Sequence, residues 1–186
     1  MVRLFIALLL PDNIKGKLGD LINDLSSRTH SIRWVAAHNI HLTLKFIGER
    51  PEKDIEPIAN VVEGAVHGRS KIKVHIKDCG GFPNLSRPRV IWVGLEGTEP
   101  AAEISGLINK KLVPMGIEAE KRKFSPHLTI GRLKKSARPP LPELSGYLEN
   151  LDFDAGSVIL DKVALVKSTL TPNGPIYENL KIYLLK

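Results

Sequence analysis

Apolar positions recur along the chain with two periods, one typical of helices and one typical of strands. Apolar residues at helical spacing predict helices that begin near positions 11 and 51 or cover 101–112 and 139–151. Alternating or continuous apolar runs predict strands over 2–10, 31–35, 40–47, 72–76, 90–95, 117–119, 157–165 and 176–185, and one more that carries His127. The glycines and proline over 80–84 predict a break in the chain. This mixture of elements predicts an α+β fold.

The predicted elements occur in the same order in the two halves of the chain. A constant offset of 86 positions relates three pairs of segments, namely 5–7 and 91–93, 21–23 and 107–109, and 41–44 and 127–130. A duplicated chain most simply packs its halves around a pseudo-two-fold axis. We therefore expect one bilobal domain over 1–186, with pseudo-symmetric halves of roughly 1–86 and 87–186. Two antiparallel sheets would flank a central cleft, and the helices would lie outside.

The most informative of these repeated segments is a tetrad that alternates polar and aliphatic residues. It reads His41-Leu42-Thr43-Leu44 in the first half and His127-Leu128-Thr129-Ile130 in the second. Side chains alternate between the two faces of a strand, so each tetrad presents one imidazole and one hydroxyl to one surface, while its aliphatic residues anchor the strand on a core. A single copy would be typical of a structural histidine. Two copies at one offset favour a functional site.

Two imidazoles that face each other across a cleft suit phosphodiester cleavage. One can be neutral and accept a proton, while the other is protonated and donates a proton to the leaving oxygen. The hydroxyls of Thr43 and Thr129 can donate hydrogen bonds to the non-bridging phosphate oxygens, where negative charge builds up in the transition state. Arg132 and Lys45 follow the tetrads closely and are expected to add positive charge. The symmetry of the tetrads leaves open which histidine is the donor.

Composition and charge restrict the partners of such a site. The formal net charge of +7 attracts polyanions, so RNA or another phosphorylated ligand is expected. The basic run 121–123 is either a solvated surface or a contact for an RNA backbone.

Cys79 is the only cysteine, which excludes an intramolecular disulfide and a thiolate metal cluster. The apolar run 4–10 is too short to span a bilayer, so we expect a soluble, cytoplasmic protein. Abundant Lys and Glu without any glutamine are typical of a thermophile.

Other chemistries fit the sequence less well. His38, His41 and His127 could supply three imidazoles to zinc, but His38 would point away from His41 in an extended strand, and no carboxylate accompanies them. The sequence has no Gly-x-Ser-x-Gly elbow, Walker motif or dinucleotide-binding glycine motif, so we expect neither a serine hydrolase nor a bound nucleotide cofactor. Some aromatic residues could stack on a base, although core packing is their more usual role. They are Trp34, Phe46 and Phe82.

The two tetrads resemble the His-x-Thr-x motifs of the 2H phosphoesterase superfamily. Further segments narrow the resemblance to the RNA 2′,3′-cyclic phosphodiesterases, historically called 2′-5′ RNA ligases. These segments are RLFIA at 3–7, WV at 34–35, NIHLTLKFIG at 39–48, FSPHLTIGR at 124–132 and STLTPNGPIY at 168–177. The resemblance covers nearly the whole chain, and Ile130 stands where the family usually has leucine.

The resemblance implies a bilobal α+β fold whose active cleft lies between the lobes. It implies hydrolysis of a 2′,3′-cyclic phosphate end of RNA to a 2′-phosphomonoester, with His41 as the proton donor and His127 as the proton acceptor. It also implies ATP-independent joining of RNA ends, including tRNA halves, through a 2′-5′ bond. Thr43, Thr129 and Arg132 would bind the substrate phosphate.

We expect the protein to act as a monomer without a metal or other cofactor, and with no membrane partner. The alternative function, a non-catalytic module that binds RNA ends, would account for the positive charge. It would leave the matched histidines of the two tetrads unexplained.

Overall fold

The computed structural model describes residues 1–172 and 174–186, so Asn173 of the segment at 168–177 lies outside the described residues. The helices are α1 (Asp12–Arg28), α2 (Ile55–Val66), α3 (Glu99–Leu112) and α4 (Pro142–Glu149), with short 3₁₀ turns η1 (Ala37–Asn39), η2 (Glu52–Asp54) and η3 (Val113–Met115). The strands are β1 (Val2–Leu9), β2 (Ile32–Trp34), β3 (His41–Arg50), β4 (Ile72–Phe82), β5 (Val90–Glu96), β6 (Leu128–Leu133), β7 (Asp154–Leu160), β8 (Lys162–Thr171) and β9 (Gly174–Leu184).

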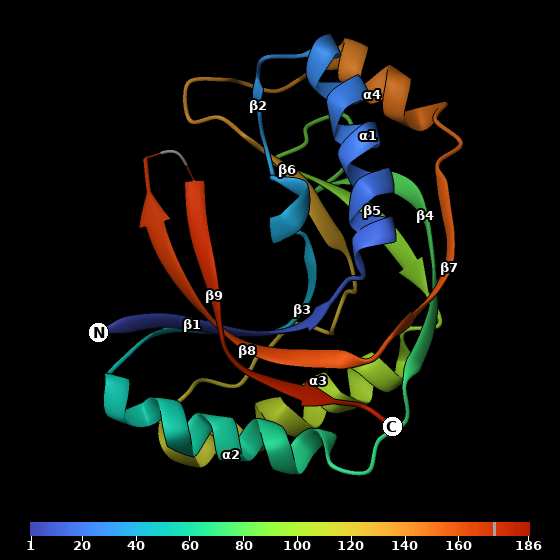
Figure 1. The fold of residues 1–186 in the computed structure, drawn as a ribbon. Helices are drawn as coiled ribbons and strands as arrows, with labels where there is room; N and C mark the ends of the chain where they lie inside the picture. The colour runs from blue at the N-terminus through green and yellow to red at the C-terminus, as the bar shows by residue number, and fades with distance from the viewer. Residues whose placement is uncertain (173) are drawn as a thin grey trace.

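The strands form one antiparallel path, with four strands on either side of its central contact between β6 and β3. Its order is β7-β4-β5-β6-β3-β1-β8-β9, and β2 pairs with β6 beside this path. Between β3 and β6 the path is joined at Leu42 and Leu128, the second residues of the two tetrads. The predicted α+β fold is confirmed, and its two expected sheets meet at this seam to give one strongly curled sheet (Figure 1).

Helices cover each half of the curled sheet from outside. The first lobe consists of β1, β3, β8 and β9 with α2 and α3, and the second lobe consists of β4 to β7 with α1 and α4 (Figure 1). The Tyr183 hydroxyl of β9 donates to the Ala59 carbonyl of α2 at 2.8 Å, and the Tyr147 hydroxyl of α4 donates to Asp24 of α1 at 2.8 Å. Each lobe thus combines segments from both halves of the chain, and each of these hydrogen bonds joins two elements of one lobe.

The aliphatic residues of both tetrads lie in the core, as the alternation predicts. Leu42, Leu44, Leu128 and Ile130 are each at most 4% exposed. Burying such a side chain stabilises the fold by about 1.5–3 kcal/mol. These buried side chains therefore anchor on the core the two strands that carry the candidate site. Among the described residues, none of the helices combines the length and apolar character needed to cross a bilayer.

Three sequence-based predictions of secondary structure are wrong. The expected break at 80–84 does not occur at its start, because β4 continues to Phe82. Gly80 serves close packing instead, since a Cβ atom there would overlap the Trp92 ring of β5. The expected strand over 157–165 is interrupted at Asp161, where the chain leaves β7 in the second lobe and enters β8 in the first lobe.

The third error is the strand expected over 117–119, which the structure shows as irregular backbone. Polar side chains hold this segment in place of a strand partner. Lys45 of β3 donates to the Glu118 carbonyl at 2.7 Å, and the backbone N–H of Glu120 donates to the Asn109 side chain at 2.8 Å. The periodicity of apolar residues could not reveal that this segment lacks a strand partner, because the side chain of Lys45 that holds it lies far away in the sequence.

Candidate active site

The polar residues of the two tetrads lie together at the seam between the lobes. Antiparallel pairing at the second tetrad residues places His41 opposite Thr129 and Thr43 opposite His127. The histidines therefore occupy one diagonal of a four-cornered patch, and the threonines occupy the other. Diagonal neighbours on such a strand pair lie about 7–8 Å apart. A small anion such as a phosphate can be held between the imidazoles, with a hydroxyl on either side.

Both histidines are oriented in the same way. Nδ1–H of His41 donates to the Asn39 carbonyl at 2.8 Å, and Nδ1–H of His127 donates to the Ser125 carbonyl at 2.8 Å. A carbonyl oxygen can only accept, so Nδ1 of each ring carries the hydrogen. Nε2 is then the nitrogen that gains or loses a proton at the site. Two equally oriented imidazoles can act as an acid and a base toward one ligand.

Each tetrad contains a β-bulge at its fourth residue. In β3 the register against β1 passes from Thr43 to Lys45, so Leu44 is the extra residue. In β6 the register against β5 passes from Thr129 to Gly131, so Ile130 is the extra residue. A bulge reverses the alternation of the side chains that follow it, up to the next bulge, which in β3 lies at Ile47. The residues that follow the tetrads therefore face the opposite way from what simple alternation predicts.

The bulge at Ile130 turns Arg132 toward the site. Strict alternation would place Arg132 on the core face with Leu128, whereas the bulged register pairs it with Val90 on the face of Thr129. Its positive charge contributes to lowering the pKa of His41, so the guanidinium lies within electrostatic range of that imidazole. The structure thus brings Arg132 together with the histidines, where it can contact an anionic ligand.

The bulge at Leu44 has the opposite effect on Lys45. Its ammonium group is buried and donates to the Asn109 side chain at 2.8 Å, on the side of α3. Desolvation lowers the pKa of Lys45, while the nearby Glu120 and Glu118 oppose this change. The expected contribution of Lys45 to the charge of the site is therefore wrong. Phe46 takes its place on the cleft face, with its side chain 50% exposed.

His41 lies in an aromatic environment that keeps it neutral. Its ring stacks on Phe5 with centroids 4.7 Å apart, and it meets the edge of Tyr177 at 5.4 Å. Burial lowers the pKa of His41 to about 4, while its hydrogen bond to a backbone carbonyl opposes this change. The positive charges of Arg132 and Lys15 lower the pKa further. An anion bound beside His41 would reverse the electrostatic part of this shift.

His127 has different neighbours. Its ring meets the edge of Phe82 with centroids 5.0 Å apart, and Phe82 in turn lies 5.4 Å from Trp92. His127 directly precedes β6, whereas His41 is the first residue of β3. The two ends of the histidine diagonal thus differ in their surroundings, although the tetrads match in sequence. This asymmetry allows the two imidazoles to take different roles.

The lowered pKa gives a first testable prediction. In an NMR titration of the ligand-free protein, His41 should remain neutral until the pH falls to about 4. Addition of inorganic phosphate should raise the pKa of His41 by one unit or more, because a nearby negative charge favours the imidazolium. His67 is exposed just beyond the end of α2, and its NMR signals should not respond to phosphate. A His41 pKa that ignores phosphate would show that no anion binds between the tetrads.

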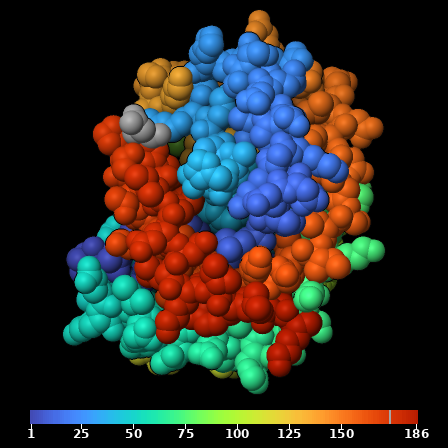
Figure 2. Space-filling model, in the orientation of Figure 1, coloured from blue at the N-terminus to red at the C-terminus, as the bar shows by residue number. Residues whose placement is uncertain are grey.

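A small hollow of about 130 Å³ lies next to His41. It is bordered by Phe5, Lys15, His38 and Tyr177, and it lies between β1, η1 and β9. The Asn39 side chain donates to the Pro175 carbonyl at 3.1 Å, which fixes η1 against the β8–β9 hairpin. Figure 2 shows the residues of η1 seated between this hairpin and α1.

The rival zinc site does not assemble around these histidines. His38 and His41 border the same hollow, whose lining does not include His127. Within residues 1–172 and 174–186, no group of three or more His, Cys, Asp and Glu side chains lies close enough to hold a metal ion. The cationic side chains of Arg132 and Lys15 lie near His41 instead, and their positive charge suits an anionic ligand.

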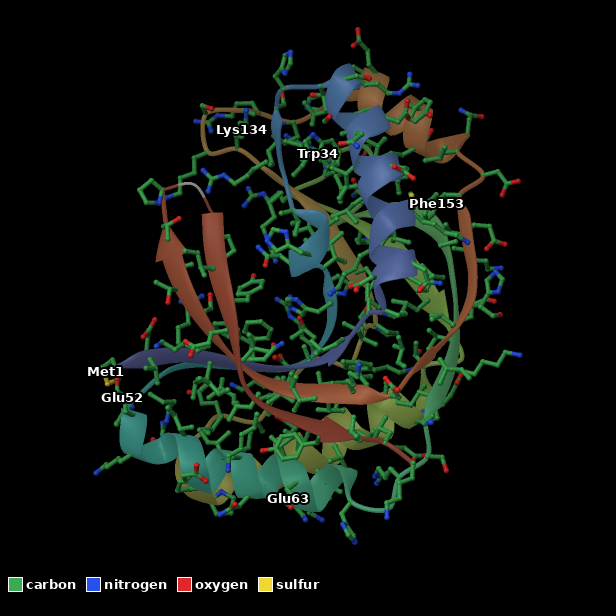
Figure 3. All side chains as sticks on the ribbon, viewed as in Figure 1. Met1, Trp34, Glu52, Glu63, Lys134 and Phe153 are labelled. Atoms are coloured by element: carbon green, nitrogen blue, oxygen red, sulfur yellow. The ribbon has the colours of Figure 1, made fainter. Side chains whose placement is uncertain are left out.

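The three candidate stacking residues have different surroundings. Trp34, labelled in Figure 3, packs over Gly131, where an added Cβ would lie 2.9 Å from the indole ring. Phe82 contacts His127, as described above. Phe46 lies on the cleft face and carries the Arg3 guanidinium 4.7 Å from its ring centroid. Phe46 is therefore the candidate with the most surface open to a ligand.

Sequence reasoning missed the groups that orient the histidines. The carbonyls of Asn39 and Ser125 each lie two positions before a histidine, and the two residues are related by the same offset of 86. This repeated spacing was the only sequence signal for these hydrogen bonds, because any residue type can supply a backbone carbonyl as acceptor. Phe5 and Tyr177, which surround His41, also escaped notice because they come from opposite ends of the chain.

Comparison with known proteins shows similarity along the whole chain. A family model described as LigT like Phosphoesterase matches residues 8–92 and 94–177. A protein of Methanothermobacter thermautotrophicus, named RNA 2′,3′-cyclic phosphodiesterase, is 35% identical over 185 residues, which are 99% of each chain. A protein of the same name from Methanocaldococcus jannaschii is 37% identical over 181 residues, covering 97% of this chain and 99% of its own.

Solved structures resemble the fold over its full length. The protein TT0787 of Thermus thermophilus matches with a TM-score of 0.83 and 26% identity, covering 98% of this chain and 97% of the other. E. coli LigT complexed with 3′-AMP matches with a TM-score of 0.77 and 23% identity, covering 99% and 98%. The likeness to E. coli LigT is one of fold.

Proposed function

The chain belongs to the LigT-like phosphoesterase family, and on that basis we propose that it hydrolyses 2′,3′-cyclic phosphate ends of RNA to 2′-phosphomonoesters. The observation that carries this proposal is the diagonal placement of two equally oriented histidines. The names of the archaeal relatives support the choice of RNA with a cyclic phosphate end as substrate.

The reaction needs an acid and a base on opposite sides of phosphorus. We infer that His127 accepts a proton from the attacking water through Nε2, while His41 donates a proton from Nε2 to the departing ribose oxygen. The new bond joins the water oxygen to phosphorus, and the bond between phosphorus and the departing oxygen breaks. Groups on a diagonal can reach both apical positions of such an in-line displacement. Both proton transfers are assigned to side chains, so the proposed step is written without a cofactor.

The low pKa of His41 is compatible with the role of proton donor. Raising this pKa from about 4 to near 7 requires about 4 kcal/mol. One negative charge at ~4 Å supplies about 4 kcal/mol at an effective dielectric constant of about 20. The negative charge of the bound phosphate can therefore raise the pKa of His41 enough for the imidazole to take up a proton from the solvent. An imidazolium held in this way transfers its proton readily once charge develops on the departing oxygen.

The threonines and Arg132 are assigned to the phosphate. The hydroxyls of Thr43 and Thr129 occupy the other diagonal, where they can donate to the two non-bridging oxygens. Arg132 reaches the same face through the bulge at Ile130 and can neutralise part of the growing negative charge. These donors are fixed by strands before the substrate arrives, so little reorganisation is needed.

We further infer that the protein acts as a monomer, because the two tetrads that form the site belong to one chain. We also infer that it acts in the cytoplasm. A 5′-hydroxyl in place of the water would be joined to the cyclic phosphate by the same proton transfers, giving a 2′-5′ bond without ATP. RNA fragments such as tRNA halves carry the required pair of ends. The net charge of +7 supports an RNA partner of this kind.

The proposed function is tested by incubating the protein with a short RNA that ends in a 2′,3′-cyclic phosphate, in the presence of EDTA. We expect the cyclic end to be opened at an undiminished rate, because both proton transfers are made by side chains. Binding of the RNA without turnover would favour the non-catalytic module. Loss of turnover in EDTA, restored by zinc, would contradict the metal-independent mechanism.

A further inference from the structure

A second hollow lies beyond the first tetrad, along the free edge of β3. It has a volume of about 550 Å³ and lies between residues 45–50 of β3 and the irregular segment 116–122. This edge is open because β3 pairs with β6 at Leu42 and Leu128 but turns away from it afterwards. The reaction proposed above leaves the hollow without a role.

The hollow adjoins the His127 end of the histidine diagonal. Thr43 is opposite His127, and Phe46 follows Thr43 along the cleft face after the bulge. Two further ladder positions separate Phe46 from Thr43, which corresponds to about 7 Å along the strand. Phe46 also borders the hollow. An RNA strand whose 5′ end lies at the nucleophile position next to His127 would therefore contact Phe46 first and then reach the hollow.

The lining of the hollow suits a nucleic acid strand. Phe46 is 50% exposed although the Arg3 guanidinium lies over its ring, 4.7 Å from the centroid, so a base can stack on the exposed part of the ring. Lys121 and Arg122 border the hollow with exposed side chains that can contact phosphates. Its volume of about 550 Å³ lies within the range of ligand pockets.

Other charged residues in the lining are engaged within the protein. Lys45 donates to the Asn109 side chain and the Glu118 carbonyl, as described above, and Arg50 pairs with Asp54 at 2.7 Å. Glu49 also borders the hollow and pairs with Arg3 at 3.7 Å, so the carboxylates of Glu118 and Glu120 are the acidic groups that offset Lys121 and Arg122 there. The balance of charge toward a ligand thus depends on the adjacent Lys121 and Arg122, which makes these two residues suitable for a test.

We propose that this hollow binds the 5′-hydroxyl RNA strand, the second strand that RNA joining requires. The proposal rests on the proposed function, in which His127 activates the attacking oxygen. A 5′-hydroxyl that replaces the water must lie at His127, and its nucleoside must lie on the side away from the cyclic phosphate. In the joining step the 5′-oxygen bonds to phosphorus, its proton passes to His127, and the departing ribose oxygen receives a proton from His41.

Binding of a 5′-hydroxyl pentaribonucleotide with a 3′-fluorophore tests the proposal by fluorescence anisotropy. A charge-reversed pair, Lys121→Glu with Arg122→Glu, should raise the Kd about tenfold or more at low salt. Phe46→Ala should raise it about fivefold or more through lost stacking. The matched control reverses two exposed lysines of α3, Lys110→Glu with Lys111→Glu, and should leave the Kd within about twofold. Thermal unfolding should show that all variants are folded.

A second arm repeats the binding measurement with saturating 2′-AMP, which represents the product end. The oligonucleotide should bind with nearly the same Kd, because the two strands occupy different sites. Displacement by 2′-AMP would show that the hollow holds the cyclic end, and equal affinities for wild type and the Lys121/Arg122 variant would show that RNA lies elsewhere. Either result overturns the proposal. Turnover of 2′,3′-cyclic AMP by wild type tests the proposed function separately.

Discussion

Replacing His41 or His127 by alanine is expected to lower kcat for a cyclic phosphate substrate by about a hundredfold or more. This is the usual scale for the loss of a positioned acid or base. Both imidazoles keep Nε2 at the site through Nδ1–H hydrogen bonds to backbone carbonyls, so each variant loses one proton transfer. The initial rate of ring opening of 2′,3′-cyclic AMP at saturation measures the effect. The double variant should be little worse than either single variant, because the two groups act in one step.

His67→Ala is the matched control for these variants, because His67 is exposed beyond the end of α2 and far from the seam. It should retain full turnover. Circular dichroism and the thermal unfolding midpoint should show that the His41 variant is folded, since removing this ring leaves a gap beside Phe5. Near wild-type turnover by either tetrad variant would mean that the two-histidine mechanism is wrong.

The sequence predicts the central part of this site because the tetrads are local and repeated. Alternation along a strand requires only neighbouring residues, so it correctly placed Leu42 and Leu128 in the core. The repeat of the motif brought the two strands together in the prediction, and they do meet at these residues. The roles of the individual histidines remain predictions, since two matching tetrads have no asymmetry of their own.

Simple alternation failed at the bulges, where a residue is added without any marked change in composition. Lys45 was expected at the site and is buried toward α3, because Leu44 is the extra residue before it. The corresponding bulge at Ile130 turns Arg132 toward the site. Both effects depend on the register against a neighbouring strand, which is fixed by contacts distant in sequence. For the same reason, neither Tyr177 nor Phe5 was expected beside His41.

The second large effect concerns the product, which should be the 2′-phosphate in at least ~100-fold excess over the 3′-phosphate, as expected when a step requires positioned groups. In a cyclic phosphate, both O2′ and O3′ are bonded to phosphorus, but only one can lie opposite the attacking water. In the proposed function Thr43 and Thr129 donate to the non-bridging oxygens on their diagonal, and the departing oxygen would then point along the histidine diagonal toward His41. The resemblance assigns O3′ to that position.

Chromatography of the products of 2′,3′-cyclic AMP against 2′-AMP and 3′-AMP standards measures this selectivity directly. RNA joined to a 5′-hydroxyl strand provides an independent test, because the same departing oxygen leaves a 2′-5′ bond at the junction. A nuclease selective for 3′-5′ bonds should cut such an RNA everywhere except at that junction, and a synthetic all-3′-5′ RNA of the same sequence is the control. A 3′-phosphate product, or complete cutting of the joined RNA, would mean that O2′ lies next to His41. The placement of the ribose in the cleft would then have to be reversed.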